Sequence, residues 1–192
     1  GQFLVRLNGR QPPRSVRGDA LSTSSAVGAH QAHVAQGELS SVISCSQCHE
    51  VPSSSSSPGH LDSQLPAELM FNRSLAGHST AGGSLIPNPV YNYSTLGCSD
   101  TYCHGNWRLR RPTFPADTSR NFMYLDSVMS GSNYSPLWTG DESEAQCGTC
   151  HGLPPAGHKD LETPISACYT CHYGSETMDV TRHVNGMVNI FG

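Results

Sequence analysis

The apolar residues of this 192-residue chain lie in short runs, between stretches rich in glycine, proline and serine. Three of these runs, at residues 3–7, 68–71 and 187–191, have the character of a strand. None approaches the roughly 18 consecutive apolar residues of a membrane-spanning helix. The pattern therefore predicts a mostly irregular fold with few short helices and short strands, and no membrane span.

The composition leaves little side-chain surface for a core. Aromatic residues make up 7% of the chain and charged residues 14%, whereas there are 19 glycines and 13 prolines. Such a composition is typical of turns and irregular backbone. The formal charge of -4 and the pI near 6.2 give no basic patch, so nucleic acid is not an expected partner.

Four cysteines are followed directly by a histidine, and each has a second cysteine three or five positions upstream. The four motifs are Cys45-Ser-Gln-Cys48-His49, Cys98-Ser-Asp-Thr-Tyr-Cys103-His104, Cys147-Gly-Thr-Cys150-His151 and Cys168-Tyr-Thr-Cys171-His172. In such a motif the two thiols add across the vinyl groups of one haem, and the adjacent imidazole binds the iron. All eight cysteines are used, so the sequence predicts four covalently attached haems c. Their expected proximal ligands are His49, His104, His151 and His172.

The second motif departs from the common spacing, because four residues rather than two separate Cys98 from Cys103. The intervening loop must bulge to keep both sulfurs within reach of one haem. The alternative there is a local disulfide beside an incidental His104. Zinc sites and disulfides are the general rivals for paired cysteines, but neither needs a histidine directly after the second cysteine.

Four porphyrins would supply the apolar surface that the side chains lack, as large plates around which loops wrap. Without haem we do not expect a fold. Residues 30–192 are expected to form this tetrahaem domain, and residues 1–29, which hold no haem cysteine, an N-terminal arm. Haem is attached covalently outside the cytoplasm, so we expect a removed secretory signal. The expected location is extracellular or at the outer cell surface, with the periplasm as the alternative.

Six histidines outside the motifs are candidates for the distal face of each iron. A haem with one protein ligand is open to substrates, whereas a haem with two only passes electrons. An internal repeat around the first and fourth motifs selects among the six. His60 follows the first motif at the same separation as His183 follows the fourth, and His33 and His158 precede these motifs at similar separations. The expected distal ligands are therefore His33, His60, His158 and His183.

Two histidines and a methionine ligand are the alternatives. His30 lies three residues before His33, a spacing that puts both rings on one side of a helical turn, where they can serve two haems. His78 lies in a loop rich in glycine and serine. A methionine ligand would raise the potential, but the five methionines sit mostly in apolar contexts. They are Met70, Met123, Met129, Met178 and Met187.

Over roughly residues 28–191 the chain resembles the multihaem c-type cytochromes of metal-reducing bacteria that mix CxxxxCH and CxxCH motifs. The likeness is carried by Gly28-Ala-His30-Gln-Ala-His33-Val, Cys98-Ser-Asp-Thr-Tyr-Cys103-His104-Gly, Trp138-Thr-Gly, Cys147-Gly-Thr-Cys150-His151-Gly-Leu-Pro-Pro and His183-Val-Asn-Gly. In size and haem count it is also similar to the tetrahaem extracellular cytochromes that polymerise into filaments, the OmcE-like nanowire subunits.

This resemblance implies bis-histidine iron throughout and haems stacked in alternating parallel and T-shaped pairs. It also implies identical subunits as partners in a homopolymer. A histidine of one subunit would then ligate a haem of the next, a role open here to His30, His33 or His78.

The expected function is electron transfer rather than catalysis, with redox donors and acceptors such as extracellular minerals or cells as further partners. A monomeric periplasmic shuttle is the first alternative. A reductase with one open haem is the second, although six spare histidines argue against it. Arg108, Arg110 and Arg111 are candidates to pair with haem propionates, and Trp107 and Trp138 to pack on porphyrin faces.

Overall fold

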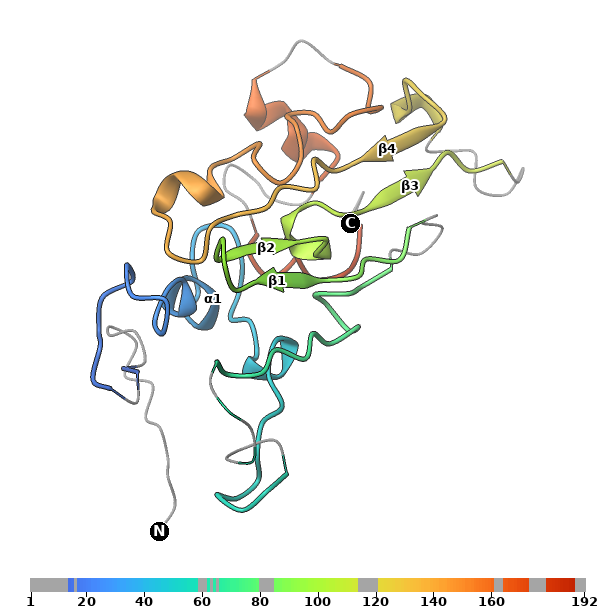
Figure 1. Ribbon diagram of the computed structural model, residues 1–192. Helices are drawn as coiled ribbons and strands as arrows, with labels where there is room; N and C mark the ends of the chain where they lie inside the picture. Colours follow the sequence, from blue (N-terminus) through green and yellow to red (C-terminus); the bar gives the residue numbers. More distant parts are fainter. Residues whose placement is uncertain are drawn as a thin grey trace.

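The regular elements of the chain are few and short (Figure 1). The computed structural model describes residues 14–15, 17–58, 62, 64, 66–79, 85–113, 121–160, 164–172 and 179–188. Within them lie the helix α1 (His30–Val34) and the 3-10 helices η1 (Cys45–Gln47), η2 (Tyr102–His104), η4 (Glu142–Ala145) and η5 (Ile165–Thr170). The strands are β1 (Val90–Asn92), β2 (Gly97–Ser99), β3 (Arg108–Arg110) and β4 (Val128–Ser130). The expected fold, mostly irregular with few short helices and strands, is confirmed.

The four strands form two separate antiparallel hairpins. Strand β1 pairs with β2, with Tyr91 opposite Cys98, and β3 pairs with β4, with Leu109 opposite Met129. The tight turn between β1 and β2 is closed by the Asn92 side chain, whose carbonyl oxygen accepts hydrogen bonds from the next backbone N–H groups. The first hairpin thus places a motif cysteine, Cys98, in a defined strand.

The segment expected as a strand at residues 68–71 takes another course. Its backbone bonds to the first Cys-His motif instead of to a strand: the Met70 N–H donates to the Cys48 carbonyl at 2.9 Å, and the Asn72 N–H to the Gln47 carbonyl at 2.9 Å. Residues 187–188 form no strand either, and the rest of the expected runs at 3–7 and 187–191 lies outside the described residues.

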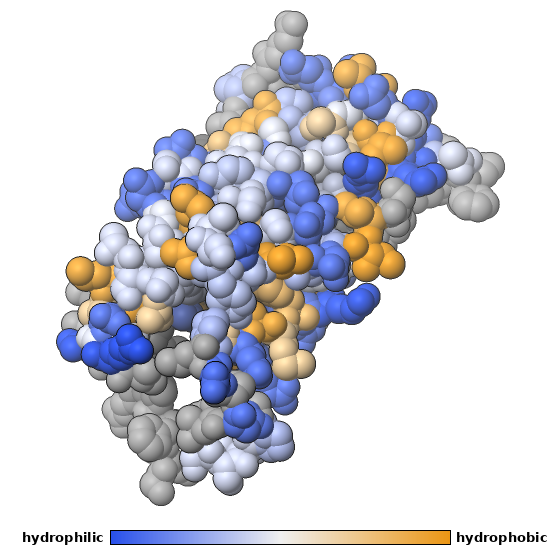
Figure 2. All heavy atoms as spheres, in the orientation of Figure 1, coloured by the Kyte–Doolittle hydropathy of each residue, from blue (hydrophilic) through white to orange (hydrophobic). Residues whose placement is uncertain are grey.

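Few apolar side chains are buried in the described part of the chain. Val27, Ala76, Met123 and Met129 are at most 7% exposed, whereas residues as large as Leu21 and Leu125 are mostly exposed. Apolar residues appear on the face in Figure 2 in small groups between polar ones. None of the helices in the described ranges has the length and apolarity that a membrane span requires. In place of an apolar core, the described part of the chain surrounds a large cavity.

Candidate functional site

The cavity has a volume of about 3880 Å³, several times the roughly 300–1,000 Å³ of an ordinary pocket for one ligand. All eight motif cysteines and all four motif histidines line it. Four further histidines line it as well: His30, His33, His158 and His183. Every cysteine is a free thiol, so the disulfide considered for Cys98 and Cys103 is not formed.

The first and fourth motifs fold into the same turn. In the first, the Cys45 carbonyl accepts hydrogen bonds from the N–H groups of Cys48 at 3.2 Å and His49 at 2.9 Å. In the fourth, the Cys168 carbonyl accepts from Cys171 at 3.2 Å and His172 at 2.8 Å. This turn brings both cysteines and the histidine to one side of the chain, as attachment to one haem requires.

The second motif has a bulged backbone between its two cysteines. Cys98 lies in β2, and the chain then turns at Asp100, whose φ of 55° is left-handed. Thr101 caps η2, with its hydroxyl oxygen accepting a hydrogen bond from the His104 N–H at 3.2 Å. The extra residues are therefore taken up by the end of the strand and a left-handed turn. Cys103 and His104 lie within η2, whereas in the first and fourth motifs the second cysteine and the histidine directly follow a 3-10 helix.

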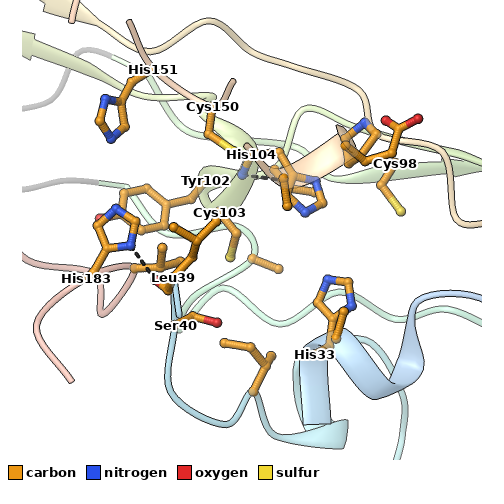
Figure 3. Close-up of a pocket in the computed structure, with 18 of the residues that line it drawn as sticks. His33, Leu39, Ser40, Cys98, Tyr102, Cys103, His104, Cys150, His151 and His183 are labelled. Carbon is orange, nitrogen blue, oxygen red and sulfur yellow. Dashed lines mark hydrogen bonds between the residues drawn. The ribbon is translucent and has the colours of Figure 1, made fainter. Parts of the chain in front are cut away.

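Across the cavity the histidines face each other in pairs, each with one motif histidine and one other histidine. The distances between ring centres and the angles between ring planes are 6.2 Å and 24° for His30 and His49, 6.2 Å and 62° for His33 and His104, 6.2 Å and 71° for His183 and His151, and 6.5 Å and 43° for His158 and His172. In Figure 3 His33 and His104 face each other across a gap flanked by Cys98 and Cys103, and His151 and His183 form a second facing pair.

These separations suit two imidazoles on opposite sides of one metal ion. A metal–imidazole nitrogen bond of about 2 Å, with about 1.1 Å from nitrogen to ring centre on each side, places two ring centres roughly 6.3 Å apart. A structural zinc site needs four protein ligands, whereas here the rings converge in twos. In the described residues no group of three or more His, Cys, Asp or Glu side chains is placed to hold a metal ion. The donor set therefore fits haem iron.

The Nδ1 atoms of six of the eight paired rings are committed to backbone carbonyls. Their acceptors are Val27 for His30 (2.7 Å), Ala29 for His33 (2.8 Å), Glu68 for His49 (3.1 Å), Gly152 for His151 (2.9 Å), Lys159 for His158 (2.7 Å) and Leu39 for His183. Such a bond fixes the tautomer and the ring orientation, and leaves Nε2 as the atom that binds a metal. The His104 Nδ1 is buried without a hydrogen-bond partner in the described residues.

Burial keeps several of these rings neutral, the form that binds a metal. Burial, and then the nearby His33, lowers the pKa of His104 to about 4. Burial also lowers the pKa of His30 and of His183. Burial, and then the proximity of Cys48, raises the pKa of Cys98 to about 11 and of Cys103 to about 12.

Two histidines stand apart from these pairs. His60, an expected distal ligand, lies outside the described residues. The ring of His78 packs edge-on against Tyr102, with ring centres 5.2 Å apart. Among the described residues it is His30 that faces His49, so the expected role of His60 stays a prediction. Each described pair consists of two histidines and leaves no position for a methionine.

The sequence repeat did not indicate that a histidine of one repeat copy can face the motif histidine of a site outside that copy. His33 faces His104 of the second motif, and His183 faces His151 of the third, so neither lies opposite the motif of its own copy. The useful signal was the spacing of His30 and His33, which puts both rings on one side of α1. Trp138 packs against both of them, Trp107 lies near His151, and Arg110 and Arg111 line the cavity.

Residues 97–151 match the family model described as the Geobacter CxxxxCH...CXXCH motif. This segment contains the second and third motifs, and it confirms there the resemblance to mixed-motif multihaem cytochromes. The eight cysteines are consistent with four haem sites. No curated protein and no solved structure matches the chain. The likeness to OmcE-like filament subunits stays a prediction.

Proposed function

We propose that this chain transfers electrons through four haems c, each with its iron bound by two histidines of the same chain. The proposal is carried by the four facing ring pairs, whose centres are 6.2–6.5 Å apart. The match to a multihaem c-type cytochrome motif supports it, since that class of protein implies electron transfer. The proposed ligand pairs are His49 with His30, His104 with His33, His151 with His183, and His172 with His158.

The mechanism follows from what the chain does to each iron. Haem, when bound, supplies a one-electron iron couple. The two histidines of each pair would hold the iron between them, so that a substrate would find no open coordination site. Six of the eight rings donate Nδ1–H to backbone carbonyls, which holds these rings in one orientation and would keep the rearrangement on electron transfer small.

Electrons must also enter and leave the protein. Cys45, Cys147 and Cys168 are exposed, whereas their partner cysteines are partly buried. Because each motif cysteine would join a haem edge, the exposed ones would place an edge of the first, third and fourth haems close to solvent. These edges are suited to exchange electrons with a redox partner.

The decisive experiment measures haem number and closure on the holoprotein. Intact mass is expected to exceed that of the polypeptide by four haems. The reduced protein is expected to bind no carbon monoxide and to show no high-spin band. Fewer than four attached haems, or carbon monoxide binding, would overturn the proposal, and binding at one haem would favour the reductase alternative.

For the assembly, we infer an extracellular filament that passes electrons towards minerals or other cells. The haem count and the exposed haem edges support it, since neighbouring subunits need such edges in contact. Because each proposed pair consists of two histidines of the same chain, no histidine of one subunit has to ligate a haem of the next. The same completeness favours a second candidate, a monomeric periplasmic shuttle. Electron microscopy of the native protein separates them: filaments support the first, and discrete particles alone support the second.

A further inference from the structure

The helix α1 carries two proposed distal ligands, His30 and His33, although it is too short to be stable alone. It has five residues and its N-cap, Ala29, makes no side-chain capping bond. Isolated helices shorter than roughly 12–15 residues are marginal even for favourable sequences. The orientation of the two rings must therefore be set by contacts from outside the helix.

Trp138 makes the contacts that reach both rings. Its indole meets His30 edge-on, with ring centres 4.7 Å apart and planes at 83°, and lies roughly parallel to His33 at 6.0 Å and 29°. Its Nε1–H donates to the Ser25 carbonyl at 2.8 Å, in the turn that leads into α1. One side chain thus contacts both ligands and the backbone that precedes them.

Gly28 makes room for this indole. A Cβ built on Gly28 would overlap the Trp138 Nε1, and the φ of +48° at Gly28 lies in the left-handed region. The neighbouring Val27 is fully buried. Residues 25–28 and the indole therefore form a close-packed contact at the start of α1, in which a side chain on residue 28 has no space.

The backbone around Trp138 is hydrogen-bonded to the segment that holds Cys98 of the second motif. Its N–H donates to the Leu96 carbonyl at 2.6 Å, and the neighbouring Pro136 carbonyl accepts from the Cys98 N–H at 3.1 Å. Cys98 belongs to the second motif, whose His104 faces His33. Trp138 thus connects the strand that holds the haem thiol with the helix that holds the distal ligand.

We propose that Trp138 is a positioning residue that fixes the ring planes of His30 and His33, and so sets the ligand geometry of the first and second haems. This inference rests on the proposed function. The angle between the two axial imidazole planes governs how the iron d orbitals split, and therefore the electron paramagnetic resonance (EPR) g values and the potential of a low-spin ferric haem. The angles here are 24° at the first pair and 62° at the second.

The test uses Trp138→Phe, which keeps an aromatic ring but removes the Nε1–H bond to Ser25, and Gly28→Ala, which keeps the indole but displaces it. EPR spectra of the oxidised holoproteins and optical redox titrations are compared with wild type. The matched control is Trp107→Phe at the other tryptophan, whose ring lies 6.3 Å from His151 of the third site.

Both variants are expected to retain four low-spin haems and to shift the EPR signals and potentials of the same two haems. The control is expected to leave those two signals unchanged. If both variants have four low-spin signals identical to wild type, or if all four shift together, the positioning role is wrong while the proposed function stands. A wild-type protein with an open, high-spin haem would instead remove the proposed function itself.

Discussion

The two ring nitrogens of each proposed distal histidine have different roles. In His33, Nδ1 donates to the Ala29 carbonyl one turn back in the chain, so Nε2 is left to face His104. In His183, Nδ1 donates to the carbonyl of Leu39, a residue far away in the sequence. A proposed distal ligand is thus recognised by an Nδ1 that donates to a backbone carbonyl together with a facing motif histidine. His78, whose ring packs on Tyr102, has no facing motif histidine among the described residues.

This distinction predicts opposite effects for two histidine substitutions. His30→Ala removes the ring that faces His49, so the first haem is expected to lose its distal ligand and bind carbon monoxide on reduction. His78→Ala is expected to leave all four haems low-spin. Carbon monoxide difference spectra of the two reduced holoproteins, scaled to haem content, measure this as about one haem in four against none.

Two results would contradict the assignment. A His30→Ala protein that stays closed would mean that another histidine, such as His60, binds the first iron. Carbon monoxide binding by His78→Ala would make His78 a ligand. Both variants keep every motif cysteine, so four attached haems by mass serve as the control for folding and haem loading.

For single residues, the sequence predicts well which residues attach each haem, but only partly which distal histidine faces which motif histidine. The covalent chemistry fixes which thiols and which histidine serve one haem, because they are adjacent in the chain. The distal partner is chosen through space. His33 and His104 are brought together through Trp138, whose ring contacts His33 and whose backbone N–H donates to the Leu96 carbonyl just before β2, and no spacing in the sequence records that contact.

Among the elements, the second motif shows how the chain accommodates extra residues. Asp100 takes a left-handed conformation and Thr101, only 3% exposed, caps η2. In the first motif Ser44 caps η1 in the same position, but its bond to the Ser46 N–H is long, at 3.4 Å, and exposed. The longer motif therefore depends more strongly on its cap.

Thr101→Ala is expected to lower the free energy of unfolding of the holoprotein by about 1 kcal/mol, because a buried capping bond to the His104 N–H is lost. Ser44→Ala is expected to cost less than half as much. Chemical denaturation followed at the haem absorption band measures both. Equal losses, or a larger loss for Ser44→Ala, would show that the cap at the longer motif has no special importance.

The short elements also show why the sequence predicts a fold class but not its strands. Each strand has three residues, too few for an alternating apolar pattern to be recognised. The run at residues 68–71 has the pattern of a strand, yet its N–H groups bond to the turn of the first motif. An apolar run indicates burial, and the partner that satisfies its backbone is decided elsewhere.

For the whole molecule, contacts between the motifs indicate the order of the haem sites. The pKa of Cys98 and of Cys103 is raised first by burial and then by the proximity of Cys48. Since Cys48 belongs to the first motif, the first motif lies beside the second. A Cβ on Gly105 would overlap the Cys150 carbonyl oxygen, which places the second beside the third. The chain then runs from the third motif through a short loop to His158, which faces the fourth. These contacts indicate that sites consecutive in the sequence are neighbours in space.

This order makes the second haem the bridge between the first haem and the rest, and gives the last prediction. In the oxidised protein the EPR signal of the first haem is expected to be broadened by its paramagnetic neighbour, since dipolar coupling falls with the cube of distance. Replacing Cys98 and Cys103 by Ser removes the second haem and is expected to sharpen that signal. Replacing Cys168 and Cys171 by Ser, at the far end of the order, is expected to leave it broad. A first-haem signal that sharpens only when the fourth haem is removed would make the fourth haem, and not the second, the neighbour of the first, and would contradict this order.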